Sequence, residues 1–257
     1  MEWRAETSRG LIRPENEDSW LVTCLPRTGK QMWLAMVADG IGGRDGGEIA
    51  SALAVKSISE YVSGSLFEDK PQDVLRKAVI CANGKILESS ARKSGVVGMG
   101  TTLTCAMIDQ EESKVYFGHI GDSRAYIISS RQIRRVTDDH SVSGELVRNG
   151  TITEEDAMRH PGRNVLTAAL GTQQEINVAI YEEHLLPNDI VVLCTDGLTS
   201  LVSSDEISDI ACQYEKDEVP ERLVDLANSR GGYDNITVIL LWPKAVQARD
   251  LLRGEVG

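Results

Sequence analysis

Short apolar runs alternate along the chain with longer amphipathic stretches, and the lengths of these segments predict the elements. The runs suit strands, because they are short and several are rich in β-branched residues. They are Trp20–Cys24, Trp33–Ala38, Thr101–Ile108, Val115–Ile120, Ala125–Ile128, Ile176–Tyr181, Ile190–Cys194 and Ile236–Trp242. Apolar residues at helical spacing predict helices elsewhere. These are Gly47–Val62, Val74–Arg92, Ser204–Tyr214 with Ser204 as N-cap, and Glu221–Ser229 with Pro220 at or near its first position.

The order of these elements indicates the fold class. Strands come in consecutive groups separated by paired helices, a pattern that favours antiparallel sheets over a parallel α/β fold. We expect an α/β protein built as a four-layer α-β-β-α sandwich of two mainly antiparallel sheets flanked by helix pairs. The polar segment Ser141–Leu170 resists assignment to a sheet, although a helix start is predicted at Thr153. We interpret it as an excursion from a single domain.

Composition and charge exclude several functions. The hydrophobic content of 41% is ordinary for a globular protein, and no apolar stretch approaches the roughly 20 residues of a membrane span. The net charge of -12 disfavours nucleic acid and anionic membranes as partners. Together with the absence of a signal peptide pattern at the start of the sequence, this predicts a cytoplasmic protein. A phosphate ligand stays possible if bound cations reverse the local field.

Acidic residues stand where several predicted strands begin or end. Asp39 closes WLAMVADG and Asp196 closes IVVLCTDG, while Asp122 follows VYFGHIG and Asp234 opens DNITVILLW. The end of one antiparallel strand neighbours the start of the next, so these carboxylates could converge. Converging carboxylates repel one another unless cations or protons intervene. An Asp-Gly pair is equally typical of a turn after a strand, and the pattern alone leaves both interpretations open.

If the acids do converge, their chemistry points to particular metals. Carboxylate and carbonyl oxygens suit Mg²⁺ or Mn²⁺ rather than zinc, and none of the histidines has the spacing of a metal site. Two such ions would lower the pKa of a bridging water and neutralise a phosphoryl group, which suits phosphate monoester hydrolysis. Arg13, just upstream of Glu17 and Asp18, is a candidate for binding the phosphate and, taken alone, an ordinary surface cation.

Ordered motifs along nearly the whole chain resemble those of the type 2C, metal-dependent serine/threonine protein phosphatases (the PPM family), particularly the compact bacterial members. The matching stretches are RGLIRPENEDS (9–19), VADGIGGRDGGEIAS (37–51), GMGTTLTCAMI (98–108), GHIGDSRAYI (118–127), VTDDHS (136–141), NVLTAALG (164–171), CTDGLTSLV (194–202) and DNITVILL (234–241). Each short motif means little alone, whereas their order and spacing form a strong signal.

The resemblance implies a central β-sandwich with a dinuclear Mn²⁺ or Mg²⁺ site at one edge. Asp39 would bridge both ions. Asp196 and Asp234 would complete the protein ligands of one ion. Glu17 and the carbonyl of Gly40 would serve the other.

Further roles are implied around this pair of ions. Asp18 would orient a metal-bound water, and Arg13 matches the arginine that contacts the phosphate. Asp122, with Asp196, matches the pair that holds a more weakly bound third metal in bacterial members. The segment 141–170 matches the mobile flap of the family, and Asp139 and His140 would stabilise its start.

The sequence departs from some relatives at Ile41, where many animal members carry a histidine proposed to protonate the leaving group. The general acid is therefore open between a metal-bound water and His160 of the flap. Ser200 and Ala168 stand where bacterial relatives often have polar or charged residues, which implies a changed substrate fit.

The sequence thus predicts an enzyme that hydrolyses phosphoserine and phosphothreonine in proteins by a hydroxide bridging two divalent cations. It would oppose a serine/threonine kinase in bacterial signalling and act as a monomer. The alternatives are a phosphatase-like binding module without turnover, which should lack the metal acids, and a phosphatase devoted to one regulatory phosphoprotein. We expect the catalytic domain to span 1–243, followed by a C-terminal tail over 244–257.

Overall fold

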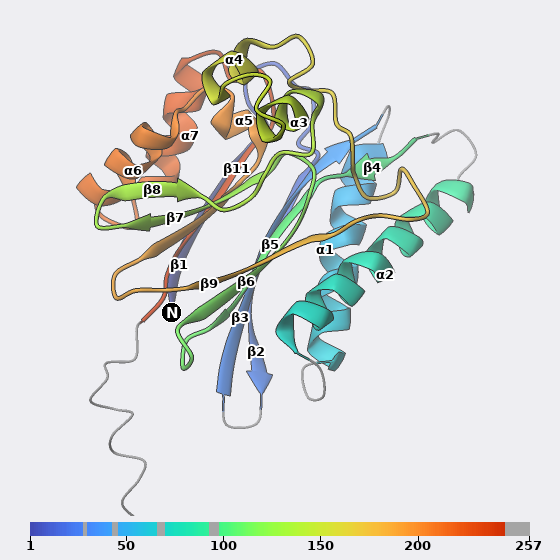
Figure 1. The fold of residues 1–257 in the computed structure, drawn as a ribbon, viewed down its shortest axis with the longest axis horizontal. Helices are drawn as coiled ribbons and strands as arrows, with labels where there is room; N and C mark the ends of the chain where they lie inside the picture. Colours follow the sequence, from blue (N-terminus) through green and yellow to red (C-terminus); the bar gives the residue numbers. More distant parts are fainter. Residues whose placement is uncertain (28–29, 43–45, 66–69, 93–97, 245–257) are drawn as a thin grey trace, which may run out of the picture.

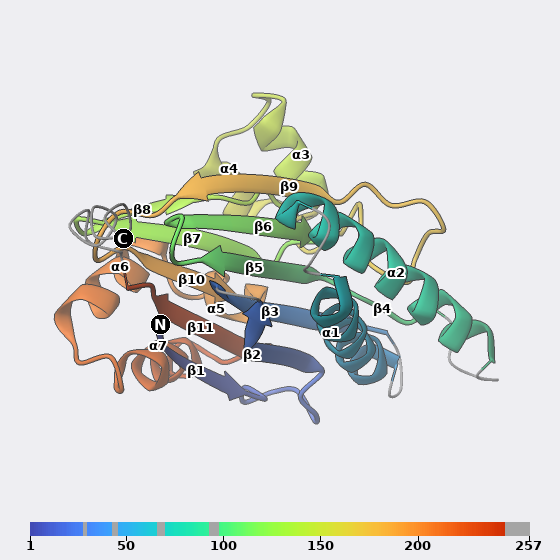
Figure 2. The same cartoon turned by 90° about the horizontal axis from the view of Figure 1, so that it is seen from below.

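The protein is a sandwich of two antiparallel sheets with helices on both outer faces, as the computed structural model in Figure 1 shows. The structure describes residues 1–257 except 28–29, 43–45, 66–69, 93–97 and 245–257. The tail expected from residue 244 therefore lies almost entirely outside the described residues. Seen from below, the two sheets lie between the helix pairs, so the predicted fold class and four-layer arrangement are confirmed (Figure 2).

Each sheet joins strands that are distant in sequence as well as consecutive ones, such as the pairs β2-β3 and β5-β6 of the second sheet. The first sheet has the order β1-β11-β10-β7-β8. Its strands are β1 (Glu2–Ser8), β11 (Ile236–Trp242), β10 (Ile190–Cys194), β7 (Arg124–Ser129) and β8 (Gln132–Arg135). The second has the order β2-β3-β5-β6-β9, with β4 paired to β3. Its strands are β2 (Asp18–Arg27), β3 (Lys30–Ile41), β4 (Gly100–Thr101), β5 (Leu103–Asp109), β6 (Lys114–Ile120) and β9 (Ala179–His184).

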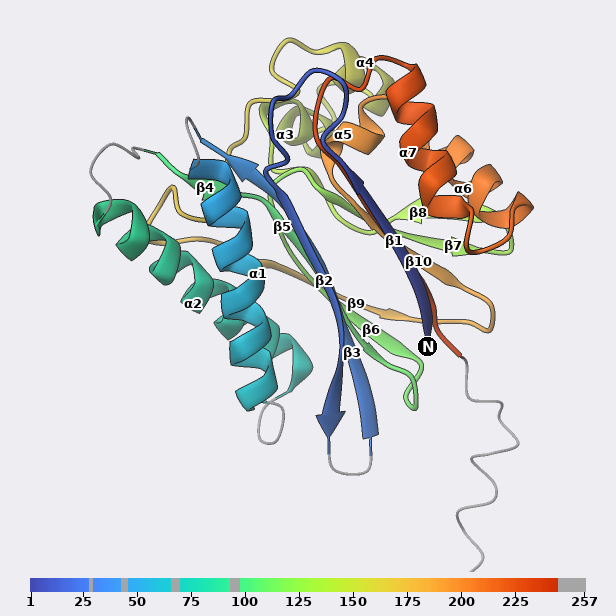
Figure 3. The same cartoon turned by 180° about the vertical axis from the view of Figure 1, so that it is seen from behind.

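Helix pairs cover the two outer faces. Helices α1 (Gly46–Ser65) and α2 (Pro71–Arg92) pack on the second sheet. Helices α6 (Ser204–Gln213) and α7 (Val219–Ser229) pack on the first sheet, with α7 against β1 and β11 (Figure 3). The excursion holds α3 (Val142–Arg148) and α4 (Glu154–Arg159), and a short α5 (Asp196–Thr199) follows β10. No helix in the described ranges is long and apolar enough to cross a membrane.

Three apolar clusters form the core, one between the sheets and one under each helix pair. Phe117, Val191 and Ile239 are fully buried between the sheets. Burial of each such side chain contributes roughly 1.5–3 kcal/mol to folding. The strands are therefore apolar on both faces through their middle portions, which is why they read as short continuous apolar runs in the sequence.

Several element limits differ from those expected. The strand expected over Ile176–Tyr181 is Ala179–His184 instead, because it pairs with β6 from His119 to Lys114. The strand expected over Thr101–Ile108 is broken at Thr102 into β4 and β5. Strands β1 and β8 and helix α3 were not predicted from their short, largely polar sequences.

The helix starts near the C-terminus also need correction. Ser203, not Ser204, caps α6: its hydroxyl accepts from the backbone N–H of Glu206, whose carboxylate accepts from the backbone N–H of Ser203. This reciprocal capping satisfies donors that a helix start leaves free. Helix α7 begins at Val219 rather than Glu221, with Pro220 inside its first turn. The helix start predicted at Thr153 is confirmed, with Thr153 as the N-cap of α4.

Candidate metal centre and active site

The strand-end acids meet at one end of the sandwich because of the strand register. Asp18 opens β2 and pairs directly with Asp39 near the end of β3. Strands β10 and β11 are antiparallel neighbours, so Asp196 after β10 lies at the same end as Asp234 before β11. Asp122 stands in the turn between β6 and β7. The register thus brings together carboxylates from both sheets, which decides between the two interpretations that the sequence pattern had left open.

These residues line one open cavity of about 720 Å³. Its walls include every candidate metal ligand and the candidate phosphate-binding arginine: Arg13, Glu17, Asp39, Gly40, Asp122, Asp196 and Asp234. Ile41 and the flap segment 164–169 complete much of the lining. Asp18 is not among the lining residues and lies behind Asp39.

The close acids raise one another's pKa. Burial first, and then the charges of Asp18, Asp196 and Asp122, hold the pKa of Asp39 well above its usual range. Burial and then Asp196 likewise raise the pKa of Asp122. Burial and then Asp234 raise that of Asp196. Without a counter-charge these carboxylates therefore favour binding protons, or cations in their place.

Backbone contacts hold the cavity wall in place. An added Cβ at Gly40 would lie 2.3 Å from the carbonyl oxygen of Gly47, and one at Gly47 would lie 2.7 Å from Glu17 Oε1. Both positions therefore require glycine for close approach. The break between β4 and β5 at Thr102 also holds this wall in place, because the backbone N–H of Asp39 donates to Thr102 Oγ1 at 3.0 Å. The backbone N–H of Thr102 donates to the Asp39 carbonyl at 2.9 Å.

The oxygen-rich lining fits hard divalent cations. Asp196 Oδ1 in the lining and Asp18 Oδ1 next to Asp39 are buried with no hydrogen-bond partner among the described residues, as expected for oxygens that need a cation or a water. Other oxygens are engaged: Arg13 Nη2 donates to Asp234 Oδ2 at 2.8 Å. Within the described part of the chain, no three His, Cys, Asp or Glu side chains form a group already arranged around an ion. A cation at Asp234 would thus compete with Arg13 for the carboxylate.

Residues 14–238 match the family described as Protein phosphatase 2C. The chain belongs to the protein phosphatase 2C family. It is 36% identical to the serine/threonine phosphatase stp of Listeria welshimeri over 239 residues, which are 91% of this chain and 93% of that protein. It is 34% identical to the protein phosphatase PhpP of Streptococcus pneumoniae over 254 residues, which are 94% of this chain and 97% of that protein.

Solved structures of related phosphatases have the same fold. The serine/threonine phosphatase Stp1 from Staphylococcus aureus superposes with a TM-score of 0.86 at 31% identity, covering 96% of this chain and 95% of that chain. The catalytic domain of PstP, solved in complex with two manganese ions, gives 0.80 at 30% identity, with 93% and 96% covered. The predictions of the family, the fold and a serine/threonine protein phosphatase are confirmed.

In this 2C-type phosphatase, Asp18 occupies a second layer behind the cavity. Its Oδ2 accepts from Thr237 Oγ1 at 2.6 Å and from Thr195 Oγ1 at 2.9 Å. Burial raises the pKa of Asp18 to about 7 despite these hydrogen bonds, and the charge of Asp196 adds to the rise. Asp18 therefore lies outside the cavity lining, next to Asp39. The role predicted for it, to orient a metal-bound water, stays a prediction.

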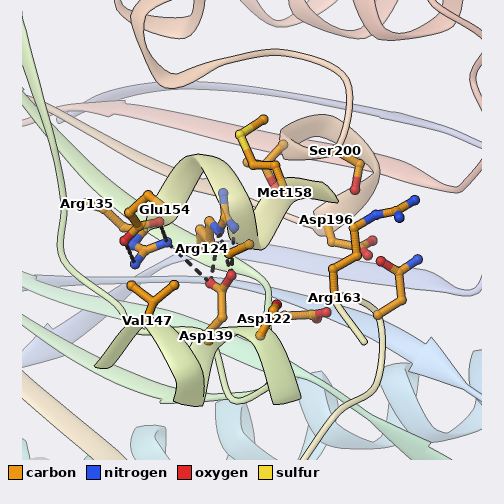
Figure 4. A pocket seen from close by; sticks show the side chains of 15 residues that line it. Asp122, Arg124, Arg135, Asp139, Val147, Glu154, Met158, Arg163, Asp196 and Ser200 are labelled. Carbon is orange, nitrogen blue, oxygen red and sulfur yellow. Dashed lines mark hydrogen bonds and ion pairs between the residues drawn. The ribbon is translucent and has the colours of Figure 1, made fainter. Parts of the chain in front are cut away.

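The flap lies over a second pocket next to the first (Figure 4). Asp122 and Asp196 line both pockets, and Ser200 lines the one under the flap. Asp139 accepts three hydrogen bonds from Arg124, at 2.6, 2.9 and 3.2 Å, where the flap begins. His140 exchanges backbone and ring contacts with Gly121. These contacts agree with the role expected of Asp139 and His140.

His160 does not reach the cavity. It ends α4, and its Nδ1 accepts from the backbone N–H of Gly162 at 3.0 Å. The described residues lining the cavity include no histidine, although they do include Ile41 and Ala168. This arrangement gives no support to His160 as the general acid.

Asn235 is a structural residue that sequence reasoning missed. Its Oδ1 accepts from the backbone N–H of Glu17 at 2.8 Å. Its Nδ2 donates to the carbonyls of Arg9 and Glu15 at 3.0 and 2.8 Å. One side chain thus fastens the loop that carries Arg13 and Glu17 to the start of β11. The Asp-Asn pair that opens DNITVILL was the sequence signal for this residue, but a role was predicted only for the Asp.

Proposed function

We propose that the chain hydrolyses phosphoserine and phosphothreonine in proteins with the help of two divalent cations, Mn²⁺ or Mg²⁺. The single observation that supports this most is the convergence of Arg13 and the strand-end acids on one open cavity. The relatives named as serine/threonine phosphatases, and the two manganese ions of the PstP structure, support the substrate and the metal.

The proposed ligands are divided between two ions. Asp39 would contribute to both sites, Asp196 and Asp234 would hold one ion, and Glu17 with the Gly40 carbonyl would hold the other. When bound, the ions would lower the pKa of the water that acts as the nucleophile and would neutralise charge on the phosphoryl group. A weaker third ion is proposed at Asp122 and Asp196, which line both pockets.

The chain's own groups bind and orient the substrate. Arg13 is half exposed at the cavity wall, where its guanidinium can exchange Asp234 for a phosphate oxygen as a cation takes the carboxylate. Two threonine hydroxyls donate to Asp18 and hold its carboxylate in a fixed position beside Asp39. The described lining of the cavity holds no histidine, and we propose water as the proton donor to the departing seryl or threonyl oxygen.

The wider setting of the enzyme follows from the same proposal. A phosphatase of this substrate class would oppose a serine/threonine kinase, and we propose bacterial signalling as its setting, because phosphatases similar to this chain come from bacteria. The cytoplasmic location, the monomeric state and the domain limits stay predictions.

Turnover measurements test the proposed function. Purified protein is expected to hydrolyse p-nitrophenyl phosphate and phosphothreonine peptides with Mn²⁺ or Mg²⁺ and to stop in chelator. Asp39→Asn is expected to lower kcat/KM by at least about 1000-fold, because it removes the ligand shared by both ions. Asp225→Asn, on the exposed face of α7, is the matched control and should behave as wild type. Full activity in Asp39→Asn, or activity without metal, would refute the mechanism.

A further inference from the structure

Four of the large exposed apolar residues either line the catalytic cavity or stand within two positions of a residue that lines it. Leu11 and Ile12, which are 64% and 66% exposed, directly precede Arg13. Tyr233, 63% exposed, directly precedes Asp234, and Val165, 54% exposed, lines the cavity from the flap side. Single exposed apolar residues need no explanation, but a group around one opening is typical of a binding surface. We call Leu11, Ile12, Val165 and Tyr233 the apolar rim.

The rim is held in place by its backbone. The N–H of Leu11 donates to the carbonyl of Gly232 at 2.8 Å. The Leu11 side chain lies against that glycine, where an added Cβ would be 3.0 Å from Leu11 Cγ. Asn235 fastens the same loop through the carbonyl of Arg9. These contacts hold the loop beside the cavity and leave the apolar side chains in solvent, where burial against a ligand would be favourable.

The position of the rim indicates which kind of ligand it binds. Arg13, Asp39 and Val165 line the same cavity, and Leu11 and Ile12 directly precede Arg13, so the rim lies close to a phosphorylated side chain bound there. In an extended peptide the neighbouring residues follow at about 3.3 Å each, so we expect the residues that flank the phosphorylated one to meet the rim. Among the described residues of the lining, Arg13 can bind the phosphate, and apolar contact for the flanking side chains comes from Ile41 and the flap residues.

We propose that the apolar rim selects phosphorylated segments with large apolar side chains close to the phosphoserine or phosphothreonine. The proposal rests on the phosphatase function proposed above and adds the sequence class of the substrate. Burial of one leucine-sized side chain against the rim favours such segments by about tenfold in kcat/KM over polar ones.

Paired substrates test the rim. Two phosphothreonine peptides of equal charge, with leucine or with serine on either side of the phosphothreonine, are compared with p-nitrophenyl phosphate, which has no flanks. Wild type is expected to prefer the leucine peptide about tenfold. In the double variant Leu11→Ser, Ile12→Ser that preference should fall to less than about threefold, with p-nitrophenyl phosphate hydrolysis unchanged.

The matched control is Leu186→Ser, which removes a leucine 61% exposed before β10, at the opposite end of that strand from Asp196. It should keep the wild-type preference. Equal treatment of the two peptides by wild type would overturn the proposal. So would a double variant that keeps the wild-type preference for the leucine peptide, whatever its overall activity.

Binding separates this proposal from the proposed function. Fluorescence anisotropy measures the Kd of the same two peptides made with a phosphonate that cannot be hydrolysed. A leucine preference in Kd that the double variant loses would support the rim even if wild type showed no turnover, an outcome that refutes only the phosphatase function. Equal Kd values for the two phosphonate peptides would refute the rim.

Discussion

Asp39 and Asp139 are both shielded carboxylates at the same end of the sandwich, yet their surroundings shift their pKa in opposite directions. Burial and the acids around it hold the pKa of Asp39 well above its usual range. Burial also acts to raise the pKa of Asp139, but the charge and hydrogen bonds of Arg124 outweigh it and lower that pKa. The side chain of Asp139 is only 12% exposed, so shielding alone does not decide the charge state.

The difference separates a structural acid from a functional one. Asp139 is paired with a cation of the chain itself, Arg124, and this ion pair joins β7 to the start of the flap. Asp39 faces further carboxylates across a cavity wide enough for ions and a phosphate. An arrangement that costs stability in the metal-free protein is expected where binding a ligand repays it. Two kinds of variant test this difference. One removes Arg124, the cation paired with Asp139, and the other removes the negative charge of Asp39 itself.

The largest expected effect comes from removing the partner of Asp139. Arg124→Met leaves that carboxylate shielded and unpaired, and we expect a loss of about 2–4 kcal/mol in the free energy of unfolding. Urea denaturation monitored by circular dichroism measures it. Arg92→Met, which breaks the exposed Arg92–Glu88 pair on α2, is the control and should change stability by less than about 0.5 kcal/mol. Equal losses in the two variants would contradict the assignment of Asp139 as a paired structural acid.

Much of the fold followed from the sequence because the inner strands are continuously apolar. Strand β10 (IVVLC) and strand β11 (ITVILLW) are buried at every position, and such runs are readable without knowledge of their partners. Strand β1 (EWRAETS) was missed because its pairing with β11 joins residues about 230 positions apart. No local pattern carries that information, and tertiary pairing overrides the weak propensity of a polar segment.

The site was partly predictable because several of its acids flank these apolar strands. Asp39, Asp196 and Asp234 are marked by strand ends, and strand register brings them together. The second-layer position of Asp18 and the loop-fastening role of Asn235 depend on contacts between distant segments, with Thr237 in one case and Arg9 in the other. Hydrogen bonds of this kind leave no periodic signal in the sequence.

A smaller effect is expected from the pH dependence of the metal-free protein. The pKa of Asp18 is raised to about 7, chiefly by burial, so the folded state binds its proton more tightly than the unfolded state. Its contribution to stability is therefore full below the unfolded pKa of about 4 and is lost as pH rises through about 7. In chelator, the free energy of unfolding of wild type should fall more steeply between pH 5 and pH 8 than that of Asp18→Asn.

With pKa values of about 4 in the unfolded state and about 7 in the folded state, the extra fall in the stability of wild type between pH 5 and pH 8 should be about 2–3 kcal/mol. Urea denaturation at several pH values measures it. Asp139, whose pKa is lowered, contributes in the opposite sense and loses its contribution only as pH falls below about 4, outside this window. Parallel curves for wild type and Asp18→Asn would show that Asp18 is ionised in the folded metal-free protein.

Thermal unfolding with and without Mn²⁺ tests most directly the central claim that cations complete the carboxylates around Asp39. Mn²⁺ at about 100 times its Kd should stabilise wild type by about 2.7 kcal/mol per site, seen as a Tm higher by several degrees than in chelator. Asp39→Asn should lose most of that rise, and Asp225→Asn should keep it. An equal rise in Tm for wild type and Asp39→Asn, or no rise in wild type, would contradict the account.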